Sequence, residues 1–214
     1  MKPIYLSFSL IFILGTSQCL GQLKRDERVK LPTSYETYFY ELDEQENWQE
    51  MNSLHEGGLI IENSFPKGNW YVDPSGETLT YVVFWTRVIN ETDRPFELAI
   101  DFPTESFRLL PSPESYLKVF LPAGKMTPDK EPFQDYGLTN LMTTFDLGFS
   151  LPSRLRKTIQ PNEEYMFNVG ALAYQGKGTA RTGLILKKEG LFYKLSFLPF
   201  VDSYLLPCGQ IILK

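Results

Sequence analysis

Alternation of apolar and polar positions is the clearest pattern in this chain. The segment 96–102 places its large apolar side chains on one face and its polar or small ones on the other. That period of two predicts a strand with one buried face. The segment 79–89 is apolar, β-branched or aromatic on both faces, which predicts a central strand covered on both sides. Only the turn-forming residues 90–95 separate the two, so we expect a hairpin. The faces of segment 79–89 carry Tyr81, Val83 and Trp85 on one side and Val82, Phe84 and Val88 on the other.

The last third of the chain repeats this strand pattern. Segments 164–174, 179–187 and 191–198 are separated by glycine-containing breaks, which predicts a meander with tight turns. Shorter strands are expected at 116–121 and 210–213, and a short helix only within 138–149. With almost no helical periodicity elsewhere, the pattern predicts an all-β fold, an immunoglobulin-like antiparallel β-sandwich of about eight or nine strands.

The region before residue 58 differs in composition from the rest of the chain. Residues 22–57 are polar and aromatic, and we expect them to form a segment distinct from a sandwich domain at 58–214. Within this segment, residues 35–40 fit one strand, and the acidic stretch 42–51 fits a short helix. The pair Gly57-Gly58 marks the boundary.

Residues 1–21 have the composition of a cleavable signal peptide. One positive charge at Lys2 precedes an apolar run of 11 residues, which is shorter than the roughly 20 residues that span a bilayer. Cleavage between Gly21 and Gln22 places small residues at the two positions that a signal peptidase selects. Two alternatives stay open, a lipid on Cys19 and a retained helix. We therefore expect an exported protein, which is periplasmic, on the cell surface or secreted, and which meets a membrane only if Cys19 is lipidated.

Charge and cysteine content narrow the range of possible functions. The net charge of −5 argues against nucleic acid as a partner. Cleavage of the signal would leave Cys208 as the only cysteine, so no internal disulfide is expected. Because Cys208 lies beside the apolar residues 211–213, we expect a buried, inert thiol.

One resemblance can be placed on specific residues. The segment from Phe84 to Pro103, with Asn90-Glu91-Thr92 at its turn, resembles a hairpin of bacterial immunoglobulin-like extracellular domains, including proteinase inhibitors of the BsuPI type. The whole chain, with its signal ending at Gly21-Gln22, resembles uncharacterised exported proteins of the Bacteroidetes. The first resemblance implies an extracellular sandwich, and the second implies no activity.

The residue inventory disfavours most catalytic chemistry. His55 is the only histidine, so a histidine-centred relay or a zinc site would have to be built on it alone, and it lies in a polar stretch. The acidic stretch 41–50 lacks the spacing of a calcium loop, and residues 176–179 lack the pattern of a phosphate loop. We expect no metal and no cofactor. A hydrolase that uses two of the 26 carboxylates remains an alternative.

Two features suggest binding to a protein or a glycan. Aromatic side chains are frequent in the less regular N-terminal part, where they would form a platform if exposed. The proline-rich segment 122–136, with Lys125 and Lys130, would present a recognition surface. The cations at 154, 156 and 157 are expected to protect a strand edge. The sequence thus predicts a non-catalytic binding or structural protein, with a secreted hydrolase or a proteinase inhibitor as alternatives. The aromatic candidates are Tyr35, Tyr38, Tyr40, Trp48, Trp70 and Tyr71.

Overall fold

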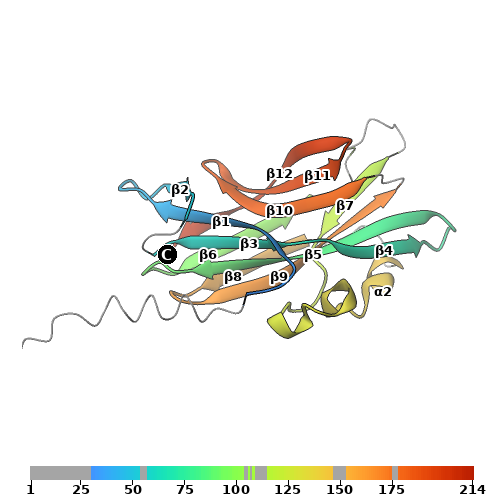
Figure 1. Cartoon of the computed structure of the whole chain (residues 1–214), viewed down its shortest axis with the longest axis horizontal. Helices are drawn as coiled ribbons and strands as arrows, with labels where there is room; N and C mark the ends of the chain where they lie inside the picture. Colours follow the sequence, from blue (N-terminus) through green and yellow to red (C-terminus); the bar gives the residue numbers. More distant parts are fainter. Residues whose placement is uncertain are drawn as a thin grey trace, which may run out of the picture. The chain divides into compact units, whose positions relative to one another are not determined.

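Two antiparallel sheets make up the fold, so the prediction of an all-β sandwich is confirmed (Figure 1). The computed structural model describes residues 30–53, 57–103, 106, 108, 115–146, 153–174 and 178–214. The expected signal peptide, its cleavage site at Gly21 and Gln22, Cys19 and His55 lie outside these ranges.

The larger sheet, sheet A, has seven strands in the order β2-β1-β3-β5-β9-β7, with β4 paired to β5 next to β3. Its strands are β1 (Ser34–Leu42), β2 (Trp48–Met51), β3 (Leu59–Ser64), β4 (Lys67–Val72), β5 (Thr78–Asn90), β7 (Tyr116–Phe120) and β9 (Glu164–Tyr174). Sheet B has five strands in the order β10-β11-β12-β6-β8. They are β6 (Phe96–Phe102), β8 (Ser153–Ile159), β10 (Thr179–Lys187), β11 (Gly190–Leu198) and β12 (Val201–Leu213).

The described residues thus contain twelve strands, more than the eight or nine expected. The additional ones include β2 and β4, which are short and mostly exposed. Such strands bury few side chains, so their alternation is faint in the sequence.

β5 is the central strand that its two apolar faces predict. Phe84 and Val88 lie in the core between the two sheets. Tyr81, Val83 and Trp85 lie in a second apolar cluster on the outer face of sheet A. Both faces of the strand are therefore removed from water, which explains the unbroken apolar run.

The outer face of sheet A is covered by residues 121–146, which we call the covering segment. It contains two 3-10 turns, η1 (Pro128–Lys130) and η2 (Gln134–Gly137), and the short helix α2 (Leu141–Asp146), which confirms the helix expected within 138–149. Met126, Tyr136 and Phe145 of this segment are buried in the second cluster. Its prolines and positive-φ residues prevent regular structure, but its apolar side chains still pack.

The hairpin expected from the segments 79–89 and 96–102 is wrong. β5 belongs to sheet A, where β3, β4 and β9 occupy its edges, whereas β6 belongs to sheet B between β12 and β8. The connection crosses between the sheets and is held by Asn90, whose side chain donates to the carbonyls of Arg94 and Ile159 at 2.8 and 3.0 Å. The predicted meander is wrong at its first step for the same reason, since β9 and β10 lie in different sheets.

The helix expected at residues 42–51 is also wrong, because β1 and β2 form a hairpin there. The carboxylate of Asp43 accepts the backbone N–H groups of Gln45 and Asn47 at 2.9 and 2.8 Å, and Glu46 has a positive φ of 59°. Asp side chains that bond to the backbone in this way favour turns over helices. Since β1 pairs with β3, residues 34–51 are part of sheet A, and the boundary expected at 57/58 falls inside that sheet.

The edges of sheet B are protected in two different ways. β8 is an edge strand, as its cations predict, and Arg154 and Arg156 pair with Asp101 and Glu97 of β6. At the other edge, β10 lies against β3 of sheet A (Figure 1).

There, side chains of sheet A bond to the free backbone groups of β10. The amide of Asn63 accepts from the N–H of Leu184 at 2.9 Å and donates to its carbonyl at 3.0 Å. The hydroxyl of Tyr40 accepts from the N–H of Leu186 at 3.0 Å. These side chains replace a neighbouring strand and close this part of the edge.

Candidate binding surfaces

The six aromatic candidates do not form one platform. Tyr40 and Tyr71 are buried and serve the fold. Tyr40 bonds to β10, and burial raises the pKa of its hydroxyl. The hydroxyl of Tyr71 donates to Asp146 of α2 at 2.5 Å, and burial together with this bond raises its pKa to about 12. Both side chains are therefore structural.

Tyr38 and Trp48 are half-buried at the margin of the sandwich core. The hydroxyl of Tyr38 donates to Glu36 at 2.6 Å, and Lys194 of β11 bonds to the same carboxylate at 2.9 Å. The ring of Trp48 stands edge-on to Phe96, with 6.3 Å between ring centroids. These contacts join β1 and β2 to sheet B, so neither ring is available as a platform.

Among the described residues, Trp70 is the most exposed large apolar side chain, with 74% of its surface accessible. It lies on the edge strand β4 opposite Thr80 of β5, and antiparallel partners point to the same face of a sheet. Val82, two residues further along β5, packs against the sandwich core. Trp70 therefore stands on the face of sheet A that is turned toward sheet B, beyond the part that sheet B covers.

Tyr35 is the second exposed candidate, and two residues that the sequence did not single out accompany it. The rings of Tyr35 and Phe65 are 4.7 Å apart, and 38% and 39% of their surfaces are exposed. The guanidinium carbon of Arg181, on β10, lies 5.5 Å from the Tyr35 ring centre and 5.2 Å from that of Phe65. We call these three residues the aromatic–arginine cluster. The cluster joins three separate stretches of chain, so no local pattern identifies Phe65 or Arg181.

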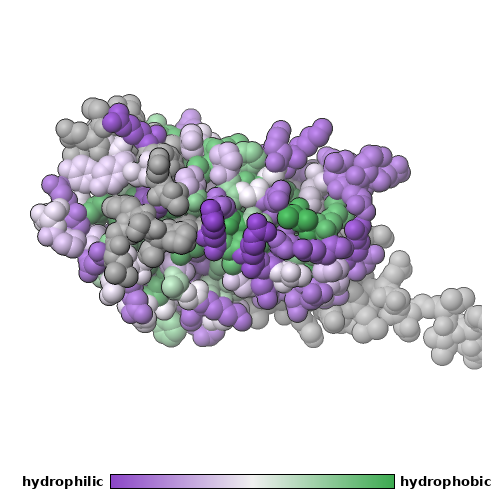
Figure 2. Space-filling model, turned by 180° about the vertical axis from the view of Figure 1, so that it is seen from behind, coloured by the Kyte–Doolittle hydropathy of each residue, from purple (hydrophilic) through white to green (hydrophobic). Residues whose placement is uncertain are grey.

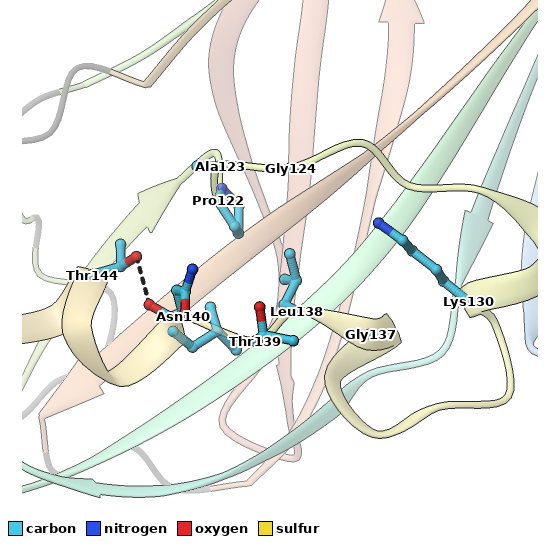
Figure 3. A pocket seen from close by; sticks show the side chains of 10 residues that line it. Pro122, Ala123, Gly124, Lys130, Gly137, Leu138, Thr139, Asn140 and Thr144 are labelled. Atoms are coloured by element: carbon cyan, nitrogen blue, oxygen red, sulfur yellow. Dashed lines mark hydrogen bonds between the residues drawn. The ribbon is translucent and has the colours of Figure 1, made fainter.

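The covering segment does not project as the recognition surface expected of it, since it packs on sheet A. It does enclose a pocket of about 340 Å³ between residues 122–124 and 137–144, with Lys130 at one side (Figure 3). The ammonium group of Lys130 donates to the carbonyl of Lys125 at 2.6 Å, while the side chain of Lys125 is exposed. Thr144 donates to the carbonyl of Asn140 at 2.8 Å. The pocket is near the lower limit for ligand sites, and its cation already has a partner.

The carboxyl groups with shifted pKa values are not suited to act as acids at neutral pH. Hydrogen bonds from neighbouring backbone and side-chain donors lower the pKa of Asp43 and of Asp73. Bonds from Lys214 and Arg156 lower the pKa of Glu97. A glycosidase acid has a raised pKa. Within the ranges given above, no three His, Cys, Asp or Glu side chains lie close enough together to hold a metal ion.

Cys208 is buried, as expected, and its thiol lies 3.6 Å from the carbonyl of Leu191. Burial raises the pKa of this thiol, which keeps it protonated and unreactive at neutral pH. The carboxylate of Asp73 accepts from the backbone N–H of Glu77 at 2.8 Å and closes the turn between β4 and β5.

The molecule can also be viewed from behind the view of Figure 1 as a space-filling surface. Figure 2 shows hydrophilic side chains standing among smaller hydrophobic areas there, so the two kinds are interspersed. Such a surface is typical of exposed protein faces.

Comparisons of this chain with protein-family models, with curated proteins and with solved structures find no match. The resemblance to bacterial immunoglobulin-like domains stays a prediction. Among the helices in the described ranges, none is both long and apolar enough to cross a membrane.

Proposed function

We propose that this chain is an exported, non-catalytic binding protein that contacts its ligand through the side of the sandwich where Trp70 and the aromatic–arginine cluster are exposed. The exposure of Trp70 is the observation that carries the proposal. Burying an aromatic side chain stabilises a complex by about 1.5–3 kcal/mol. Trp is also depleted at ordinary surfaces and enriched at binding hot spots. The local fold does not need the Trp70 side chain, since 74% of it is in water.

The position of Trp70 relative to the cluster supports a shared surface. Phe65 lies two positions before the start of β4, and Trp70 lies five positions further along the chain than Phe65. At about 3.3 Å per residue, an extended chain places them up to roughly 16 Å apart. A ligand of several sugar units, or an extended partner segment, spans that distance.

The two alternative functions, a proteinase inhibitor and a secreted hydrolase, have less support. A proteinase inhibitor presents a loop that projects from a rigid scaffold, whereas the proline-rich segment 122–136 packs on sheet A. A glycosidase needs a carboxyl group with a raised pKa, whereas the shifted carboxyl groups have lowered ones.

Tryptophan fluorescence tests the proposal, because the three tryptophans differ in exposure. Trp85 is fully buried, Trp48 is half-buried and Trp70 is exposed. We would titrate the protein with soluble neutral glucan, xylan and galacturonan, and with proteins secreted by neighbouring cells. A ligand on this surface is expected to shift the emission to the blue and to protect Trp70 from acrylamide quenching.

Trp70→Ala is expected to lower affinity at least tenfold and to remove the emission change. The matched control is Phe133→Ala, which removes another exposed ring, 59% accessible, from the covering segment. Binding by no member of the panel, or an equal loss in both variants, would contradict the proposal.

A further inference from the structure

Arg181 differs from the arginines in β5, in the connection from β5 to β6 and in β8. Arg87, Arg94, Arg154 and Arg156 each pair with a carboxylate. Arg181 has no carboxylate partner in the described part of the chain; its one hydrogen bond runs to the carbonyl of Ala180 at 2.8 Å. A guanidinium carries five N–H donors, so most of those on Arg181 remain for a ligand.

The guanidinium of Arg181 is also held in place before any ligand binds. The bond to Ala180 fixes one nitrogen, and the rings of Tyr35 and Phe65 lie 5.5 and 5.2 Å from the guanidinium carbon. Cation–π contacts of this length restrain an arginine side chain without using its donors. A restrained fork of donors recognises a carboxylate by two parallel hydrogen bonds and loses little entropy in doing so.

The backbone beside the cluster is already hydrogen-bonded, which limits the kind of ligand. The N–H of Phe65 donates to the carbonyl of Thr33 at 2.8 Å, and the carbonyl of Phe65 accepts from the hydroxyl of Tyr136 at 2.6 Å. On β10, Asn63 bonds to both backbone groups of Leu184. A peptide that adds as a strand needs free backbone groups along an edge. Recognition at this place therefore uses side chains, namely two ring faces and one guanidinium.

We propose that the aromatic–arginine cluster binds the carboxylate of a uronic acid unit in an acidic glycan. The C–H face of a sugar ring packs on Tyr35 and Phe65, and its carboxylate bonds to Arg181. This inference rests on the proposed function and specifies its ligand. The neighbouring Trp70 would contact another sugar unit of the same chain, so a polymer is expected to bind more tightly than a single uronic acid.

Isothermal titration of the full chain with an oligogalacturonate tests this assignment. The comparison ligands are its methyl ester, which keeps the rings but not the charges, free galacturonate and polyglutamate. We expect the acid to bind at least tenfold more tightly than the ester, because bonds to charged groups are worth about 1.5–3 kcal/mol. Arg181→Gln should lose that preference and bind acid and ester alike. Arg181→Lys should recover only part of the affinity, because it lacks the planar fork.

Arg154→Gln is the matched control, since Arg154 is exposed but paired with Asp101; it should leave binding unchanged. Thermal unfolding of each variant verifies that it is folded. Equal binding of acid and ester by the natural protein would overturn the inference. Binding of polyglutamate as tight as that of the oligogalacturonate, and dependent on Arg181, would assign the site to acidic peptides instead. Binding of neutral glycans that depends on Trp70 but not on Arg181 would refute the inference and leave the proposed function standing, whereas no glycan or protein binding at all would refute both.

Discussion

The two faces of sheet A are held in different ways. On the inner face, the core against sheet B consists of apolar side chains from both sheets, such as Phe84, Phe96 and Tyr193. On the outer face, the covering segment rests on apolar contacts and also on specific polar ones, since Tyr81 donates to Asp135 at 2.8 Å and Tyr71 donates to Asp146. Away from the edge at β10, where Asn63 and Tyr40 bond to backbone groups, the inner face depends mainly on the packing of its apolar side chains. The outer face depends on particular polar partners as well as on packing. Substitutions on β5 and its neighbours are therefore expected to separate the two faces.

The largest loss of stability is expected from Phe84→Ala, which opens a cavity in the inner core. Phe84 is among the largest fully buried side chains. Such a truncation costs about 3–5 kcal/mol of unfolding free energy. Urea unfolding measures it, and a loss below 1 kcal/mol would show that this core is loosely packed.

A smaller loss is expected from Tyr81→Phe, which removes one hydroxyl under the covering segment. Asp135 is buried, and its other carboxylate oxygen, Oδ1, has no hydrogen-bond partner within the described ranges. Losing the bond from Tyr81 leaves a buried carboxylate without compensation, which costs about 2–3 kcal/mol. Tyr71→Phe is the matched control, because its partner Asp146 is exposed and water replaces the bond; a loss under about 1 kcal/mol is expected there. Equal losses would contradict the distinction.

Asn168→Leu on β9 is expected to stabilise the protein, unlike the substitutions above. Asn168 lies opposite Trp85 on the outer face of sheet A, and neither atom of its buried amide has a partner in the part of the chain described. Replacing an unbonded buried amide by an apolar group should raise the unfolding free energy by about 1–2 kcal/mol. Asn63→Leu should do the reverse, because both the nitrogen and the oxygen of that buried amide are hydrogen-bonded. Destabilisation by Asn168→Leu would mean that the amide has a role that its surroundings do not reveal.

Alkaline pH is also expected to lower the stability of the fold, and this loss should come from the tyrosines. Burial and the bond to Asp135 raise the pKa of Tyr81 from 10.0 to about 12. A raised pKa means that folding favours the protonated form, so this stabilisation is complete below pH 10 and is lost as the pH rises toward 12. Stability measured between pH 9 and about 12 should therefore fall. The fall should be shallower in Tyr81→Phe, and an unchanged slope would contradict the contribution of this residue.

Strand positions could be predicted from the sequence better than strand pairing could. The bounds of β6 follow from the alternation of its side chains. Those of β9 and β10 follow from strand-favouring residues on either side of a glycine-containing break, and the two buried faces of β5 follow from its composition. All of these are local properties of the sequence. The pairing of strands is not local, so the hairpin between β5 and β6 was wrong although both strands were right.

The residues of the candidate surface could also be predicted only in part. Tyr35 and Trp70 could be singled out as aromatic residues in an irregular region, but their exposure could not. Phe65 and Arg181 are separated by more than half of the chain and meet only because β10 folds against β3. No pattern within one segment contains that information.

The side-chain closure of β10 has a consequence for how the chain reaches its native state. Asn63 and Leu184 are separated by 121 positions in the sequence. Contacts of such high sequence separation form late, after the entropy of closing a long loop has been overcome. Until then the edge of β10 is open, and partly folded molecules can pair through it. We therefore expect the docking of β10 on Asn63 and Tyr40 to protect this edge from pairing with other molecules.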